Sequence, residues 1–103
     1  MDLFEKEVRN KLKFLSEDDK IYLKKNYIYE LFQKHKIFDH EINAIFDPKK
    51  AIAIYPNAAF AERIDIEVVP AKGRTLKVII QFDPFVRGLK MNGKLGIITA
   101  FWI

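Results

Sequence analysis

Apolar and polar residues alternate along two neighbouring stretches in the second half of the chain, residues 62–69 and 74–82. A repeat of two residues is typical of strands with one apolar and one polar face. Pro70 and Gly73 lie between the two stretches and favour a turn. The pattern therefore predicts an antiparallel hairpin. The polar face of this hairpin is expected to carry three cations together: Arg63, Arg74 and Lys77. This face is a candidate functional surface.

The first half of the chain shows helical spacing instead. Asp2 can cap a helix whose apolar residues recur every three or four positions as far as Leu15. Ser16 is followed by three acidic residues, which predicts the start of a second helix that runs to about Lys36. A third, short helix is expected over residues 39–47, because a proline follows it.

Two further strands are expected, at residues 51–55 and 95–103. The second has no charged residue, so it should lie inside the sheet with both of its faces covered. Residues 83–94 are interpreted as a loop whose Asn92-Gly93 pair forms a turn.

The order of these elements predicts one domain over residues 1–103, with a helical part at 1–47 and a sheet part at 51–103. Helices followed by strands indicate the α+β class. The N-terminal helices are expected to pack on a four-stranded, mainly antiparallel sheet.

Composition and charge narrow the possible functions. The chain has no cysteine, which excludes disulfides, thiolate metal sites and a cysteine nucleophile. Its net charge is +4, and from Lys72 onward six basic residues stand against one acidic residue. This asymmetry suits a polyanionic partner. The charged start and the lack of a membrane-spanning apolar run lead us to expect a soluble, cytoplasmic protein that does not bind membranes.

The candidate chemistry is limited to acids, bases and cations. His35 and His40 lack a recognisable metal-ligand spacing, and no phosphate loop, nucleophile elbow or dinucleotide motif is present, so no metal or cofactor is expected. This set of residues suits metal-free cleavage of RNA, in which the ribose 2′-hydroxyl is the nucleophile and the protein supplies proton transfer and positive charge. DNA lacks that hydroxyl and should be cut poorly.

Five short motifs occur in the order KHKI, DHEINAIFDP, AERIDIEVV, GRTLKVII and GIITAF. This order resembles the BrnT branch of the RelE-like ribonuclease toxins over roughly residues 34–101. The resemblance implies an endoribonuclease toxin that a cognate antitoxin or immunity protein neutralises. The catalytic roles would fall on His35, Arg63, Arg74 and Thr99. The basic residues expected to bind RNA are Lys72, Lys77, Arg87, Lys90 and Lys94.

The resemblance has three departures. Two helices are expected where the family has an opening strand, Lys36 stands where the family has glycine, and residues 83–94 are an insertion. The barnase- and colicin-like toxin domains, which end in a similar Thr-Ala-aromatic strand, are a second possible relationship.

Structural roles remain open for the same residues. His35 could be a buried, hydrogen-bonded core histidine, and Arg63 and Arg74 could pair with Asp65 and Glu67 on a solvent face. A non-enzymatic nucleic-acid-binding or antitoxin-like interaction module is the alternative function, and a catalytically inactive member of the fold is a third. The oligomeric state is open.

Overall fold

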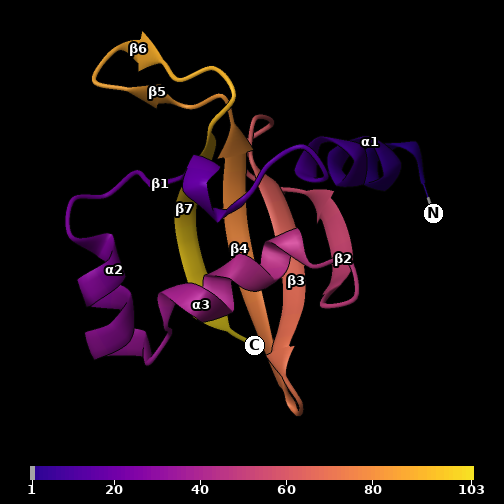
Figure 1. Cartoon of the computed structure of the whole chain (residues 1–103), viewed down its shortest axis with the longest axis vertical. Coiled ribbons are helices and arrows are strands. Elements are labelled where there is room, and N and C mark those ends of the chain that lie inside the picture. Colours follow the sequence, from indigo (N-terminus) through magenta and orange to yellow (C-terminus); the bar gives the residue numbers. More distant parts are fainter. Residues whose placement is uncertain (1) are drawn as a thin grey trace.

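Five strands form the main sheet of the computed structural model, which describes residues 2–103 (Figure 1). Across the sheet they are β1 (Lys20–Tyr22), β7 (Leu95–Trp102), β4 (Arg74–Phe82), β3 (Ile64–Ala71) and β2 (Ala51–Pro56). β1 runs parallel to β7, and all other neighbours are antiparallel. The α+β class is therefore confirmed. The expected four-stranded sheet is wrong, because a fifth, parallel strand makes the sheet mixed.

That fifth strand replaces most of the helix expected after Ser16. The cap forms as predicted: the hydroxyl of Ser16 accepts a hydrogen bond from Asp18 N at 3.3 Å, and the carboxylate of Asp19 accepts one from Ser16 N at 2.9 Å. The helical turn η1 (Glu17–Asp19) then ends at once, and β1 follows. The reason is tertiary, since β1 supplies backbone partners to residues 95–97 of β7, which would otherwise have none on that side. A strand thus lies between α1 and the later helices, and residues 1–47 are not wholly helical.

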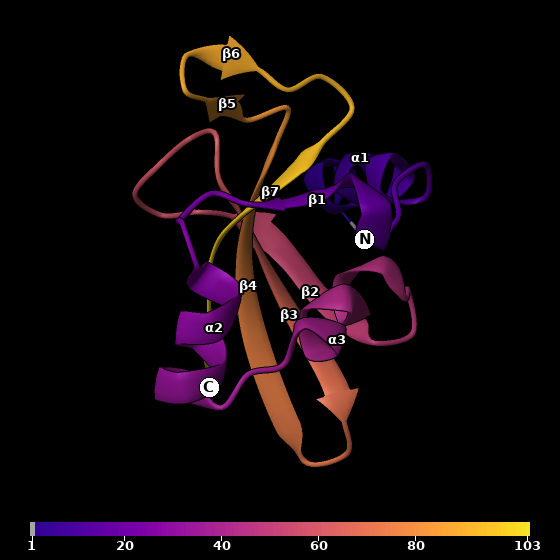
Figure 2. The ribbon, with the colours of Figure 1, turned by 60° about the vertical axis from the view of Figure 1, so that its left-hand side comes forward.

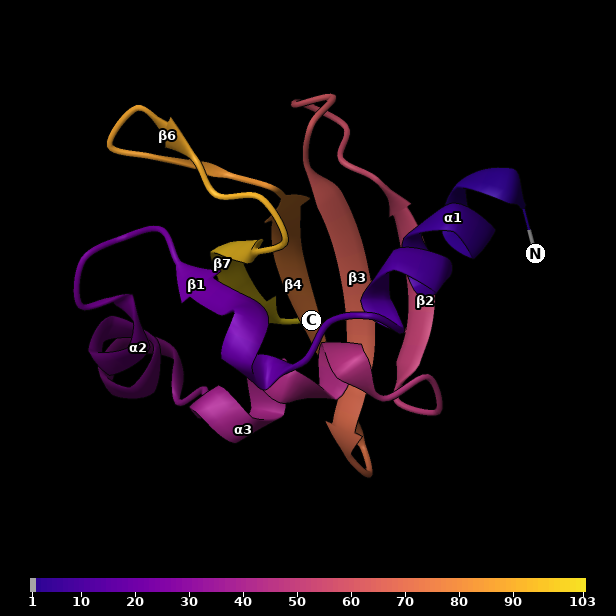
Figure 3. The ribbon, with the colours of Figure 1, turned by 45° about the horizontal axis from the view of Figure 1, so that its top comes forward.

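The helices lie on one face and along one edge of the sheet. They are α1 (Leu3–Leu12), α2 (Tyr27–Glu30), the π-helical turn η2 (Leu31–His35), α3 (Asp39–Ile42) and the turn η3 (Asn43–Phe46). The carboxylate of Asp2 caps α1 as predicted, accepting from Glu5 N at 2.7 Å. In Figures 1 and 3, α3 crosses in front of the sheet, whereas α2 stands beside the edge beyond β7.

The core lies between the sheet and the covering helices. The hairpin forms as predicted, and its apolar residues pair across β3 and β4, for example Ile66 with Val78 and Val68 with Leu76. All four of these side chains are fully buried. β7 lies inside the sheet as expected, but its outer face is only partly covered, since Phe101 is 37% exposed.

Residues 83–94 contain more structure than the expected loop. The Asn92-Gly93 turn forms as predicted, and Gly93 N donates to the carboxylate of Asp83 at 2.8 Å. Before it, β5 (Phe85–Val86) and β6 (Leu89–Lys90) pair as a separate two-stranded ribbon that projects from the top of the sheet in Figure 1.

One departure from the toxin motif lies at the end of η2. Lys36 has a φ of 56°, in the left-handed region, and Ile37 N donates to Leu31 O at 3.2 Å across the helix end. This is a helix C-terminus that favours glycine. Lysine therefore occupies a strained position where the toxin family has glycine.

Lys36→Gly should raise the free energy of unfolding by about 1 kcal/mol, because glycine relieves the left-handed backbone. For a domain of this size the midpoint of thermal unfolding should rise by about 5 °C. Lys34→Gly, two residues earlier and inside the helix, should lower stability by about 1 kcal/mol. A loss of stability in both variants would contradict the strain assigned to Lys36.

Candidate functional site

Two of the four predicted catalytic residues meet at the C-terminal end of β7. The indole Nε1 of Trp102 donates a hydrogen bond to the backbone oxygen of His35 at 3.1 Å. The guanidinium of Arg74 lies over the same indole ring, with Cζ 3.7 Å from its centroid. His35 and Arg74 are both exposed. Trp102 therefore contacts both the main chain of His35 and the guanidinium of Arg74. Because His35 is exposed, it is not the buried core histidine that the sequence left open.

Local structure dictates this meeting. Arg74 begins β4 and shares a sheet face with Leu76, whose direct partner on β7 is Trp102. His35 is the last residue of η2, which runs along the edge of β7. Figure 2 shows the lower end of this helical segment beside the C-terminal end of β7. The sequence motif pointed to His35 and Arg74, but no signal in it marked Trp102 as the residue that joins them.

Thr99 lies higher on the same strand and already has a partner. Its hydroxyl is 2.6 Å from the hydroxyl of Tyr27, which also accepts a hydrogen bond from Ala100 N at 3.3 Å. Tyr27 is only 3% exposed. Thr99 is thus part of the contact that fixes α2 to the edge of β7, which is a structural role.

Arg63 lies at the opposite end of the hairpin. Residues 63 and 71 are separated by about 26 Å along a strand, and Ala71 is the partner of Arg74. Arg63 also belongs to the other face of the sheet, since Ile64, the next residue, points into the core. Its guanidinium stacks over Phe60 at 4.0 Å, and among the described residues its buried Nε has no hydrogen-bond partner. Arg63 and Arg74 therefore cannot contact the same phosphate.

The expected three-cation face of the hairpin is wrong for the same geometric reason. Strand alternation places Arg74 with Leu76 on the helix side, and Lys77 with Arg63 on the outer side. The outer face is also neutralised locally. Lys77 Nζ is 3.6 Å from the buried carboxylate of Asp65, and the Tyr55 hydroxyl donates to Glu67 at 2.5 Å.

This outer network shifts the ionisation of its members. The Tyr55 hydroxyl, followed by the Asp65 and Glu67 carboxylates, raises the pKa of Lys77 although partial burial opposes the shift. Burial and then the hydrogen bond to Glu67 raise the pKa of Tyr55. Lys77 therefore stays charged and paired within the sheet, instead of forming the open basic surface that the sequence predicted.

The other predicted RNA-binding residues are spread over both ends of the molecule. Lys72 is exposed in the turn between β3 and β4, beside Arg74. Arg87 and Lys90 are exposed on the projecting ribbon at the far end of the sheet. Lys94 lies 3.8 Å from the carboxylate of Asp19. Only Lys72 is near the His35–Arg74 pair.

His40, the other histidine of the chain, has a different partner from His35. Its imidazole stacks on the ring of Phe38, with centroids 5.5 Å apart and planes at 23°. Across the described residues 2–103, no three His, Asp or Glu side chains gather closely enough to hold a metal ion. No helix of the same range is long and apolar enough to cross a membrane.

A polar cluster that the sequence did not reveal links β1 to α3. Lys20 Nζ lies 2.6 Å from the carboxylate of Asp39 and also donates to the side chain of Asn43. The hydroxyl of Tyr22 donates to the same carboxylate. The side chain of Lys20 is 6% exposed, whereas that of Asp39 is 44% exposed. The cluster depends on β1 being a strand, so a helical prediction for residues 20–22 could not have found it.

Ionisation within this cluster is coupled to folding. Burial alone would raise the pKa of Asp39, but hydrogen bonds from Lys20 and Tyr22 and the charge of Lys20 together lower it. Burial, followed by the hydrogen bond to Asp39, raises the pKa of Tyr22. Both shifts favour a carboxylate at position 39 beside a neutral phenol at position 22.

Comparison with known proteins adds no assignment: no family model matches the chain, and neither a curated protein nor a solved structure does.

Asp39→Asn should lower the free energy of unfolding by about 2 kcal/mol at pH 7, because it leaves the buried ammonium of Lys20 without its countercharge. The native pKa of Asp39 lies below its unfolded value, so the contribution is complete above about pH 4 and disappears as the pH falls through the native pKa. Denaturant unfolding from pH 7 to pH 2 should therefore show the two proteins converging in acid.

Asp18→Asn is the matched control, since among the described residues its exposed carboxylate makes no ion pair. It should change stability by less than about 0.5 kcal/mol at any pH. If the difference in stability between the parent and the Asp39→Asn variant persists unchanged at pH 2, the charge of Asp39 is not what stabilises the cluster.

Proposed function

We propose that this protein is a metal-independent endoribonuclease of the toxin type, with His35 and Arg74 as its reactive pair. The observation that carries the proposal is their convergence on Trp102, one through a hydrogen bond to the main chain and the other through a guanidinium–indole contact. An imidazole and a guanidinium are the side chains that can supply the two functions that cleavage through the 2′-hydroxyl needs: proton transfer and stabilisation of phosphate charge.

In the proposed reaction His35 takes the proton of the ribose 2′-hydroxyl. The 2′-oxygen attacks the adjacent phosphorus, the bond from phosphorus to the 5′-oxygen breaks, and water protonates the departing oxygen. The products are a 2′,3′-cyclic phosphate and a 5′-hydroxyl. Arg74 stabilises the charge that grows on the phosphoryl oxygens, and the exposed Lys72, two residues before Arg74, holds the flanking backbone.

This proposal narrows the set of catalytic residues expected from the sequence. Arg63 lies about 26 Å from Arg74 along the hairpin, and Thr99 is hydrogen-bonded to Tyr27. Both are assigned structural roles. A toxin of this kind acts in the cytoplasm, where its RNA lies, and needs an antitoxin or immunity protein that blocks it.

A non-enzymatic interaction module is the second candidate, favoured by a specific observation. Two of the four residues implied by the toxin resemblance serve packing, and the outer face of the hairpin is neutralised by its own ion pair. A module that binds RNA or protein needs no assembled proton-transfer site. A parent protein that binds RNA without cutting it would establish this second function in place of the first.

His35→Ala and Arg74→Ala should each reduce cleavage by a factor on the order of 10²–10³ while both variants stay folded, since each side chain is exposed. The matched control is Arg63→Ala, an arginine of the same hairpin at its other end, which should cut at the parental rate. Cleavage of a short RNA in EDTA should yield cyclic or terminal phosphates at the 3′ ends. A substrate with 2′-O-methyl at the cut site should remain intact.

Two results would contradict the reactive pair. One is equal loss of activity in the Arg63 and Arg74 variants, which the separation of the two residues forbids. The other is cleavage that stops in EDTA, because the proposed chemistry uses only the side chains and the 2′-hydroxyl of the substrate.

A further inference from the structure

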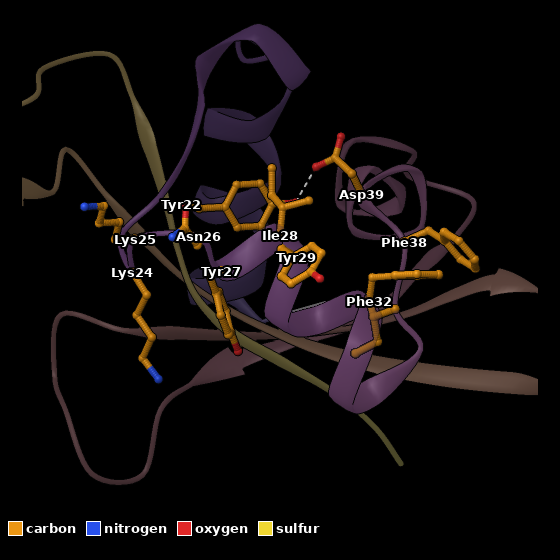
Figure 4. A pocket seen from close by; sticks show the side chains of 11 residues that line it. Tyr22, Lys24, Lys25, Asn26, Tyr27, Ile28, Tyr29, Phe32, Phe38 and Asp39 are labelled. Carbon is orange, nitrogen blue, oxygen red and sulfur yellow. Dashed lines mark hydrogen bonds between the residues drawn. The ribbon is translucent and has the colours of Figure 1, made fainter.

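An open groove of about 710 Å³ lies between α2, α3 and β1, away from the His35–Arg74 pair. Its walls are mainly aromatic and aliphatic, and four large side chains stay 44–64% exposed within it: Ile28, Tyr29, Phe32 and Phe38. Phe32 and Phe38 form one end of the groove, as Figure 4 shows, with ring centroids 5.1 Å apart.

The fold forces these side chains outward. α2 and η2 bury Tyr27 and Leu31, four residues apart, against the rest of the protein. Ile28 and Phe32, also four apart, each follow one of these buried residues and therefore lie together on the neighbouring, exposed side of the helix. A contiguous group of exposed large apolar residues marks an interaction site more often than an ordinary surface.

Cations flank the apolar wall at both ends. Lys24 and Lys25 lie at the end opposite Phe32 and Phe38 in Figure 4. Lys36 lies over the ring of Phe32, 5.7 Å from its centroid. Within residues 2–103 none of these three lysines makes an ion pair. The one carboxylate that lines the groove, Asp39, is already held by Lys20.

We propose that this groove binds an amphipathic helix of a partner protein, with an apolar face and acidic residues at its flanks. Apolar anchors spaced three and four residues apart would fill the aromatic groove, which is the helix-in-groove mode of recognition. Glutamates or aspartates near the two ends would meet Lys24, Lys25 and Lys36. The volume lies within the usual range for a binding site.

The groove walls favour a protein helix over RNA bases. A base needs hydrogen-bond partners for its edges, and most polar groups that line the groove are already bonded. The Tyr22 hydroxyl donates to the Asp39 carboxylate, and the Tyr29 hydroxyl accepts from Gln33 at 2.6 Å. Apolar side chains make no such demand. The inference rests on the groove alone and is independent of the RNA-cleaving reaction.

The test uses a fluorescein-labelled peptide of Leu, Ala and Glu, about 18 residues long so that it can form a helix. Its leucines share one helix face. Fluorescence anisotropy should show saturable binding, and amide shift changes in the NMR spectrum should cluster in α2, η2 and α3. A scrambled peptide of the same composition and a Leu/Lys peptide of the same pattern should both bind at least about tenfold more weakly.

Two double variants and a matched control locate the site. Phe32→Ser with Phe38→Ser, and Lys24→Glu with Lys25→Glu, should each weaken binding by about tenfold or more. Leu3→Ser with Leu89→Ser removes two apolar side chains outside the groove that are more exposed than Phe32 and Phe38, at 71% and 69%, and should leave binding unchanged.

Three outcomes would overturn the proposal. The first is equal binding of the patterned and scrambled peptides, and the second is parental affinity in both groove variants. The third is displacement of the bound peptide by a single-stranded oligouridine, which would assign the groove to RNA.

Discussion

The second edge of β7 is the constraint on which the arrangement of this protein depends. β4 satisfies one edge along the whole strand, but the other edge needs a second set of partners. β1 supplies them for residues 95–97 only. Farther along β7, the hydroxyl of Tyr27 accepts a hydrogen bond from Ala100 N and is hydrogen-bonded to the hydroxyl of Thr99. This edge of β7 is therefore bonded first to strand β1 and then to the side chain of Tyr27 from α2.

The bonding of this edge of β7 determines where the His35–Arg74 site and the groove lie. Because Tyr27 fixes α2 to β7, the helical segment that continues from it ends beside Trp102, where His35 meets Arg74. Because the same helical segment buries Tyr27 and Leu31, its neighbouring side exposes Ile28 and Phe32 to the groove. The proposed reactive pair and the groove therefore both depend on the contact between Tyr27 and β7, and a change at Tyr27 should affect both.

The sequence predicts the parts of the fold that local patterns specify. The hairpin, the capped first helix, the Ser16 cap and the α+β class follow from spacing and capping chemistry. β1 is not predicted, because a run of three residues, Lys20–Tyr22, is too short to show a periodicity. These residues form a strand because they pair with the edge of β7. The candidate site is only partly predictable, because its residues come together through contacts between distant parts of the sequence. His35 and Arg74 come together through Trp102, a contact across 67 residues of sequence, whereas strand alternation separates Arg74 from Arg63.

Hydrogen exchange in the Tyr27→Phe variant tests the docking contact most directly, because phenylalanine keeps the packing and removes only the hydroxyl. The amide of Ala100 loses its acceptor in this variant, so its exchange should accelerate strongly relative to the parent. The indole N–H of Trp102 should accelerate with it, as the helix that carries His35 loosens from the edge of β7. Unchanged exchange at both positions would show that the hydroxyl of Tyr27 does not hold α2 in place, and the common origin of the two surfaces would be wrong.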